Sequence, residues 1–256
     1  MHTARIAALL EPFLEQPLSP SQLDQISTYI NLLLRWNARI NLTAIRKEEE
    51  IVTRHFGESF FLATHLFPKL SSLCHPERSQ DMRGAPVLAE SKDPRTSSVP
   101  APPQGILPAP STSLSVLDIG SGAGFPALPL KIWSPQIHLT LIESNHKKAA
   151  FLREVARSLT LTNVDVIADR AEVLAARPDH PQAEVVTLRA VEHFDKILPQ
   201  AAAFLAPTAT LAVLISAAQL PKVSTLTNVS WHPPLPVPQS RSRVLLIGYR
   251  PTVGTT

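Results

Sequence analysis

The sequence is poor in glycine and cysteine and has no long hydrophobic run. Of its 256 residues, only 8 are glycine and one is cysteine, Cys74. A single cysteine excludes an internal disulfide framework and a cysteine-based zinc site. Glu11 and Pro12 interrupt the apolar stretch 6–10, and no apolar run reaches the roughly 18 residues of a membrane helix. We therefore expect no signal peptide, no membrane span and a reducing, cytoplasmic location.

The charge and the length set only weak limits on the function. The chain has 24 Lys and Arg against 21 Asp and Glu, a net charge of +3. This balance permits an anionic partner without demanding one. The length fits one or two domains, and 44% hydrophobic with 18% charged residues is typical of a globular protein.

Proline marks one segment as different from the rest. The chain contains 25 prolines, roughly twice the usual share, and eight of them lie in residues 73–114. This segment has no aromatic residue, no periodicity, and four basic residues that balance four acidic ones. Such a composition predicts a disordered insertion. It would separate a small helical N-terminal segment, residues 1–72, from a larger domain, residues 115–256.

Apolar periodicity and capping signals predict the elements on either side. Ser19, Pro20 and Gln22 suit the N-cap, the first turn and the capping box of a helix that we expect to end near Trp36. A short helix precedes it, and another spans about 48–66. After the insertion the pattern predicts strands at 115–119, 138–142, 164–168, 184–188, 210–215 and 243–249, and helices at 126–133, 146–159 and 194–205. This alternation predicts an α/β fold with a parallel sheet covered on both faces.

Three of the eight glycines lie in the turn after the first of these strands, at Gly120, Gly122 and Gly124. Such a turn lets a ligand approach the backbone closely, although a tight turn without a ligand remains an alternative. The spacing is G-x-G-x-G, whereas a dinucleotide site favours G-x-G-x-x-G. Asp118, just before the turn, would repel a pyrophosphate but suits an ammonium group. Glu143, at the end of the next strand, can accept both hydroxyls of a ribose, and the combination indicates S-adenosylmethionine.

A second candidate contact follows the third strand. In a doubly wound sheet the ligand lies across the carboxyl ends of the strands, so Ala171 and Glu172 can reach an adenine there. An ordinary helix start explains the same pattern equally well.

Several short motifs occur together in a specific order. Trp36-Asn37 and Asn41-Leu42-Thr43 match W-N-x-x-x-N-L-T, and Arg54-His55 with Ser59 match R-H-x-x-D-S apart from its Asp. Residues 118–126 form the glycine turn, and 151–152, 170–172 and 189–190 follow in order. On these motifs the chain resembles the bacterial small-subunit rRNA guanine-N7 methyltransferase family, also called glucose-inhibited division protein B. The resemblance covers residues 19–72 and 115–250.

This resemblance implies a fold, a reaction and a partner. The fold would be that of a class I S-adenosylmethionine-dependent methyltransferase, Rossmann-like with a mostly parallel seven-stranded sheet, behind the helical N-terminal segment. The reaction would methylate guanine N7 in the 530-loop region of 16S rRNA, near the decoding site, in the naked rRNA or in the small ribosomal subunit. We expect a monomer. The family pattern places cofactor contacts at Gly120, Phe125, Ala171, Glu172 and Arg189, and the residues themselves add Asp118, Gly122, Gly124 and Glu143.

The chain departs from the family pattern in two motifs. Glu58 stands where the family has a shorter Asp. Ile215 and Ser216 stand at the end of the fifth strand, where the family usually has Lys-Gly. The second departure removes a cationic contact to RNA. It keeps open a nucleotide-binding or RNA-binding module without activity, and a small-molecule methyltransferase is a further alternative.

Methylation of guanine N7 requires few catalytic groups from the protein. Its lone pair is free, so alignment with the methyl donor supplies most of the catalysis and no general base is expected. The Asn-Pro-Pro-Tyr type motif used on exocyclic amines is absent. Methylation of cytosine C5 needs a thiolate, and Cys74 falls in the proposed insertion. No histidine spacing indicates a metal site.

Basic residues supply candidates for contact with RNA phosphates. Arg54 and His55 are one pair, although a surface arginine beside a half-buried histidine is equally plausible. The helix after Glu143 has a basic face with Lys147, Lys148, Arg153 and Arg157, which is either an RNA contact or a merely solvated face. We expect Trp36, Asn37 and Asn41 to pack and cap a helix end instead of contacting bases.

Overall fold

The computed structural model describes residues 1–67, 113–189 and 194–251. The proposed insertion, residues 73–114, lies outside these ranges except for residues 113 and 114, and so does Cys74. Its predicted disorder therefore stays a prediction.

Four helices form the N-terminal segment. They are α1 (Thr3–Leu10), α2 (Pro20–Asn37), α3 (Glu48–Ile51) and α4 (Glu58–Leu66). The predicted capping box of α2 is present, because Ser19 and Gln22 each bind the other's backbone. The single helix expected over 48–66 is interrupted by a π-helical stretch, Val52–Gly57, which contains Arg54 and His55. Such π-helical turns are frequent at functional sites.

The larger domain is built on one twisted sheet. Its strands are β1 (Ser115–Ile119), β2 (His138–Ile142), β3 (Val164–Ile167), β4 (Ala183–Arg189), β5 (Leu205–Ser216), β6 (Ser230–Trp231), β7 (Leu235–Pro236) and β8 (Arg243–Tyr249). Their order is β3-β2-β1-β4-β5-β8-β6, with β1 to β5 parallel and β8 antiparallel. This is the class I methyltransferase fold that the resemblance implies. The described residues form eight strands instead of seven because the edge strand is split: β6 and β7 both pair with β8.

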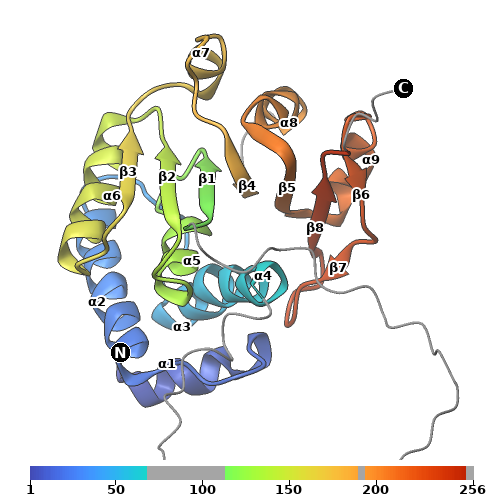
Figure 1. The fold of residues 1–256 in the computed structure, drawn as a ribbon. Helices are drawn as coiled ribbons and strands as arrows, with labels where there is room; N and C mark the ends of the chain where they lie inside the picture. The colour runs from blue at the N-terminus through green and yellow to red at the C-terminus, as the bar shows by residue number, and fades with distance from the viewer. Residues whose placement is uncertain (68–112, 190–193, 252–256) are drawn as a thin grey trace, which may run out of the picture.

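Helices cover both faces of this sheet (Figure 1). One face packs α5 (Ala127–Trp133) and α6 (His146–Ser158) together with the N-terminal helices, in a single core that includes Tyr29 and Phe60. The other face packs α7 (Ala171–Ala175), α8 (Phe194–Ala203) and α9 (Leu220–Val223). Figure 1 shows the blue and cyan N-terminal helices beside α5. The N-terminal segment is thus part of the core that supports the sheet.

The alternation of side chains along the strands directs several polar residues toward the N-terminal helices. Val116 and Val185 belong to the core on that face. Because side chains two residues apart point to the same face, Asp118 and Thr187 lie there too, and the two are register partners on β1 and β4. Arg189, two residues further along β4, follows the same rule. The carboxyl edge of the sheet therefore presents its polar side chains beneath the N-terminal segment.

Candidate functional site

The glycine turn after β1 has a backbone that only glycine adopts easily. Gly120, Gly122 and Gly124 all have positive φ angles, of 69°, 56° and 85°. The turn is anchored to the next strand, since the N–H groups of Gly120 and Ser121 donate to the Ile142 carbonyl at 2.9 and 3.1 Å. Gly120 is exposed and Gly122 is partly exposed, so the backbone of the turn is open to a ligand at these two positions.

Gly122 and Gly124 face different surroundings. A Cβ atom at Gly122 would meet only the Gly120 carbonyl oxygen, at 3.7 Å. A Cβ atom at Gly124 would collide with the Tyr29 hydroxyl and would lie 2.6 Å from Leu128 Cδ1. Of the predicted contacts, Gly122 therefore faces open space, whereas Gly124 is a packing position against α2 and α5.

Tyr29 holds the turn from the side of the N-terminal segment, and the sequence analysis missed it. It is fully buried on α2, its hydroxyl donates to the Ala123 carbonyl at 2.5 Å, and its ring stacks on Phe125 with centroids 5.2 Å apart. Burial raises the pKa of this hydroxyl well above its usual value, and the carboxylate of Asp118 adds to the effect. The available signal was a tyrosine on the apolar side of a helix, because a buried hydroxyl needs a partner.

We expect Tyr29→Phe to weaken the turn without unfolding the protein. The change removes the bond to Ala123 and leaves that carbonyl without the donor, which costs about 1–3 kcal/mol. Urea denaturation measures this loss. Tyr249, on β8 and partly exposed, offers a matched Tyr→Phe change, and an equal loss there would contradict the assignment.

Asp118 is the buried acid beneath the turn. It is 1% exposed, and its Oδ1 accepts a hydrogen bond from the Thr187 hydroxyl at 2.5 Å. Its Oδ2 is buried with no partner among the described residues. Burial raises the pKa of this carboxyl to about 7, against the opposing effect of the Thr187 hydrogen bond. An unpaired carboxylate oxygen fits the ammonium group of S-adenosylmethionine, so the residues present fit this cofactor.

The raised pKa of Asp118 predicts a pH dependence of stability. Its pKa is about 7 in the folded protein, against an ordinary value of 3.8. The folded state therefore holds the proton more tightly, and this group makes the free energy of unfolding fall as the pH rises from about 4 to about 7, by at most about 1.4 kcal/mol per pH unit. In urea titrations at a series of pH values from about 4 to about 7, the free energy of unfolding should show this fall for the wild type and not for Asp118→Asn. Parallel curves for the two proteins would contradict the assignment.

Glu143 at the end of β2 is tied to the turn. Its Oε2 accepts the Gly122 N–H and its Oε1 accepts the Asn145 N–H, both at 2.8 Å, and it is 6% exposed. Each carboxylate oxygen has a second lone pair, so both can still accept a ribose hydroxyl. The structure thus shows that Glu143 holds the Gly122 backbone. The ribose contact expected from the sequence stays a prediction.

The predicted adenine contacts lie after β3, at the same edge of the sheet. Ala171 begins α7 and is buried, whereas Glu172 is exposed and lies 3.5 Å from the guanidinium of Arg170. No side chain caps this helix. The position agrees with the prediction, but no contact in the structure tests it.

Arg189 joins the end of β4 to the N-terminal segment. Its guanidinium donates to Glu58 at 2.9 Å and to the Arg54 carbonyl at 2.5 Å, and it lies 5.9 Å from the centre of the Phe125 ring. Glu58, 2% exposed, also pairs with Arg243 at 3.4 Å. The acid that departs from the family pattern is therefore the shared partner of two arginines.

His55 does not lie where the sequence analysis suggested. It is 9% exposed, its ring stacks on Phe125 at 4.6 Å, and its two nitrogens bind Thr43 and Arg189 at 2.9 and 3.1 Å. Burial, followed by the charge of Arg189, lowers the pKa of this ring to about 2. The structure favours the alternative of a largely buried histidine over a phosphate contact, because both ring nitrogens already have partners within the protein. Arg54 remains exposed.

Arg243 supplies a cation near the end of β5. It pairs in register with Ser216 across the antiparallel β5–β8 ladder. The uncharged Ile215 and Ser216, which the sequence analysis treated as a lost cationic contact, are therefore accompanied by a guanidinium from the neighbouring strand. This neighbour was invisible in the sequence because residues 216 and 243 meet only through strand pairing.

The basic residues of α6 do not form one face. Arg153 donates to the Val166 carbonyl at 2.8 Å, and Arg157 pairs with Glu154 at 2.6 Å. At about 100° per residue, Lys148 lies roughly 140° around the helix from Arg153. The single basic face inferred from the sequence is corrected in this respect, and the role of these residues with RNA stays a prediction.

Asn37 confirms the expected helix-end cap. Its Oδ1 accepts the N–H groups of Leu42 and Thr43 at 2.8 and 3.0 Å, and its Nδ2 donates to the Thr43 carbonyl. The motif around Trp36 and Thr43 is thus partly a folding device.

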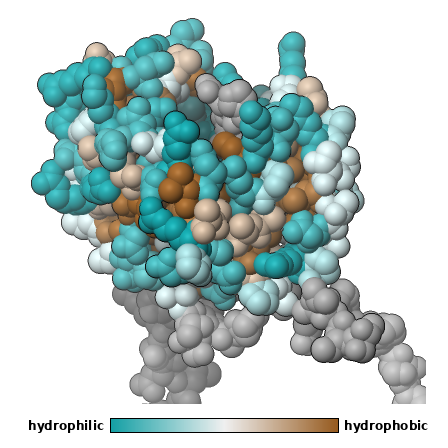
Figure 2. Space-filling view, turned by 90° about the horizontal axis from the view of Figure 1, so that it is seen from above, coloured by the Kyte–Doolittle hydropathy of each residue, from teal (hydrophilic) through white to brown (hydrophobic). Residues whose placement is uncertain are grey.

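The described residues contain no group of three or more His, Cys, Asp or Glu able to hold a metal ion, and none of their helices has the length and hydropathy needed to span a membrane. Figure 2 shows one face on which hydrophilic residues surround scattered hydrophobic ones. In the same ranges Val173, 46% exposed, is the one large hydrophobic side chain that is strongly exposed.

Comparison with known proteins places the chain in a family. The family model described as "rRNA small subunit methyltransferase G" matches residues 22–73 and 107–228. Proteins named ribosomal RNA small subunit methyltransferase G are similar, one from Roseiflexus castenholzii at 39% identity and one from Bacillus subtilis at 31%, each match covering 68% of this chain and 56% of the relative. A solved SAM-dependent methyltransferase from Aquifex aeolicus is 16% identical, with a TM-score of 0.45 over 54% of this chain and 82% of that one. The chain spans about half the length of the curated relatives it matches. On the extent of the family match, the chain belongs to the GidB family of small-subunit rRNA methyltransferases.

Proposed function

We propose that this chain transfers the methyl group of S-adenosylmethionine to N7 of a guanine in the 530-loop region of 16S rRNA. The observation that carries the proposal is the carboxyl edge of the sheet. There the unpaired Oδ2 of Asp118 lies beneath a glycine turn whose Gly122 backbone is open. The family membership supplies the class of substrate.

The chain's own residues would hold the reactants and do little chemistry. Asp118 accepts the ammonium group, Glu143 accepts the ribose hydroxyls, and the start of α7 borders the adenine. Bound S-adenosylmethionine would supply a methyl group on a sulfonium. Its carbon–sulfur bond would break as the bond to N7 forms, with release of S-adenosylhomocysteine and transfer of the positive charge to the guanine, so no proton has to be removed first. Positioning is therefore the main contribution of the protein.

The charge around this edge favours RNA over a small uncharged acceptor. Arg189 and Arg243 share one carboxylate, Glu58, and Arg54 is exposed beside them. Because His55 is neutral, Arg54, Arg189, Arg243 and Glu58 together leave an excess of positive charge beside the turn, whereas the acids Asp118 and Glu143 lie at the proposed cofactor contacts themselves. Phosphate groups are the natural complement of clustered arginines.

Methyl transfer to ribosomal substrates tests the proposal. Radiolabelled S-adenosylmethionine is incubated with the chain and either undermethylated small subunits or naked 16S rRNA, and the product nucleosides are separated. We expect label in 7-methylguanosine from one of the two substrates, and the comparison identifies which. Label in another nucleoside would replace the proposed site of methylation. Cofactor binding without transfer to either substrate would favour an inactive RNA-binding module.

A further inference from the structure

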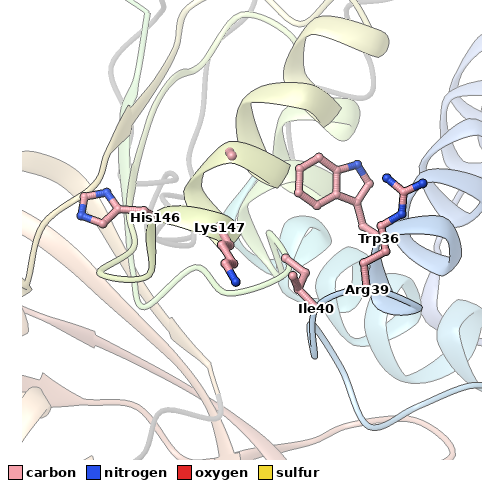
Figure 3. A pocket seen from close by; sticks show the side chains of 6 residues that line it. Trp36, Arg39, Ile40, His146 and Lys147 are labelled. Carbon is pink, nitrogen blue, oxygen red and sulfur yellow. The ribbon is translucent and has the colours of Figure 1, made fainter.

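A groove runs between the end of α2 and the start of α6. It lies beside the carboxyl edge of the sheet, where the cofactor is proposed to bind and which we call the cofactor edge. Two adjoining hollows make it up. The larger, of about 500 Å³, is lined by Trp36, Arg39, Ile40, His146, Lys147 and Ala150. The smaller, of about 260 Å³, is lined by Arg35, Trp36, Arg39 and Glu154. Trp36 and Arg39 belong to both hollows, so they mark the middle of the groove. Figure 3 shows the residues that line the larger hollow.

Trp36 is fixed in place but not covered. Its ring packs edge-on against Phe151, with centroids 5.7 Å apart and planes at 61°. It is only partly buried, and Figure 3 shows the indole lying between the two helices. A rigid, partly exposed indole is a platform on which a flat ring can stack.

The cations of the larger hollow have no partners. Arg39 and Lys147 are exposed, and neither has a side-chain ion pair or hydrogen bond with the residues that the structure describes. In the smaller hollow Arg35 pairs with Glu154, which also binds Arg157. The positive charge available to a ligand is therefore concentrated at Arg39 and Lys147.

The groove adjoins the cofactor edge through the first turn of α6. Asn145 caps this helix, and its N–H binds Glu143, the residue assigned to the ribose. His146 and Lys147 follow directly in the chain. A ligand in the larger hollow would thus lie next to the cofactor edge, not on a remote surface.

We infer that this groove binds one nucleotide of single-stranded RNA, next to the nucleotide that is methylated. The base stacks on Trp36, which the sequence analysis expected only to pack a helix end, and its phosphate lies between Arg39 and Lys147. A volume of about 500 Å³ falls in the range of roughly 300–1,000 Å³ typical of small-ligand sites. A duplex would keep its bases stacked on each other, so a single-stranded region is the form that Trp36 can read. The inference rests on the proposed function only for the identity of the polymer as RNA.

Binding of a fluorescently labelled 12-nucleotide single-stranded RNA, measured by anisotropy without cofactor, tests this inference. Trp36→Leu should weaken binding by about tenfold or more, because stacking is lost, and Trp36→Phe should keep most of the affinity. Arg39→Ala with Lys147→Ala should make the slope of log affinity against log salt shallower by about 0.7, since the two cations together neutralise one phosphate and each neutralised phosphate contributes about 0.7. Lys196→Ala is the matched control: it removes an exposed cation from α8, which covers the other face of the sheet, and should change the affinity little.

Three results would overturn the inference. They are unchanged affinity in Trp36→Leu, an unchanged salt slope in the double variant, and an effect of Lys196→Ala equal to that of the double variant. Urea denaturation checks that Trp36→Leu is folded, and the double variant changes only exposed side chains, so it keeps the test valid if the tryptophan variant unfolds. Competition by poly-glutamate as strong as by RNA would indicate an acidic protein partner instead.

The failure of this inference can be told apart from failure of the proposed function. If the wild type methylates 16S rRNA but the groove variants bind RNA normally, only the groove assignment fails. If the groove variants lose RNA binding while the wild type transfers no methyl group to any ribosomal substrate, the groove assignment stands and the proposed function fails.

Discussion

Replacing Glu58 with Gln should destabilise the protein by about 3–5 kcal/mol, which is the usual cost of breaking a buried ion pair from one side. The Glu58 carboxylate is 2% exposed and lies between Arg189 and Arg243 at 2.9 and 3.4 Å. A glutamine keeps the shape but removes the charge, so two largely buried guanidinium groups lose their only carboxylate partner among the described residues. The free energy of unfolding from urea titration measures the effect.

The chain contains a matched control for this change. Glu154 on α6 also lies between two arginines, Arg35 and Arg157, at 3.4 and 2.6 Å. It is 25% exposed instead of 2%, and its partners are exposed, so Glu154→Gln should cost about 1 kcal/mol or less. Equal losses in the two variants would show that burial does not set the strength of the Glu58 pair.

The Glu58 variant also reports on the excess of positive charge near the site. With its carboxylate removed, the cluster of Arg189 and Arg243 should bind a free anion more strongly. We expect inorganic phosphate to raise the unfolding midpoint of Glu58→Gln more than that of the wild type, since binding to the folded state stabilises it. Glu58→Asp, which restores the family's acid with one methylene less, should recover part of the lost stability.

Gly124→Ala should mainly lower the stability of the protein, whereas Gly122→Ala should mainly lower its affinity for S-adenosylmethionine. At Gly124 the new Cβ collides with Tyr29 and lies 2.6 Å from Leu128 Cδ1, at a φ of +85°. Overpacking and the left-handed backbone together should cost about 2–5 kcal/mol. At Gly122 the Cβ meets only the Gly120 carbonyl at 3.7 Å. The loss of stability there should be limited to the backbone strain of about 1–2 kcal/mol.

The affinity for S-adenosylmethionine should fall most in the variant at Gly122. The open space at Gly122 is where the ligand is proposed to approach the backbone, so Gly122→Ala should lower the affinity at least about tenfold, or 1.4 kcal/mol. Calorimetry on the folded variant measures this change. Unchanged affinity would remove Gly122 from the cofactor site.

In a Tyr29→Phe background the colliding hydroxyl is gone, so Gly124→Ala should lower the free energy of unfolding by less. A double-mutant cycle of the two changes gives the coupling between Tyr29 and Gly124.

Most of the fold could be predicted from the sequence because its signals are local. The capping box at Ser19, the alternation of apolar strands with amphipathic helices, and the glycine turn after β1 all appear as predicted. The predictions failed where no local signal exists. The split edge strand of β6 and β7 and the short helix α9 consist of two to four residues each, too few to show a period.

The π-helical stretch at 52–57 is a subtler case. Its residues have the apolar spacing expected of an ordinary helix, and the sequence gives no sign of the change in hydrogen bonding. The stretch carries Arg54 and His55 toward Arg189, so its geometry depends on contacts with β4. Tertiary packing often decides the detailed form of a helix in this way.

The sequence by itself determined which residues form the glycine turn, that an acid precedes it and that another ends the next strand, because these features are encoded within a few residues of one another. Only the tertiary structure decided the protonation states and partners of the site. Arg189 meets Glu58 across 131 positions of the chain, His55 becomes neutral inside the core, and Arg243 reaches the end of β5 through strand pairing. Burial and charge pairing are properties of the packed molecule, since they depend on side chains that are distant in the sequence and close only after folding.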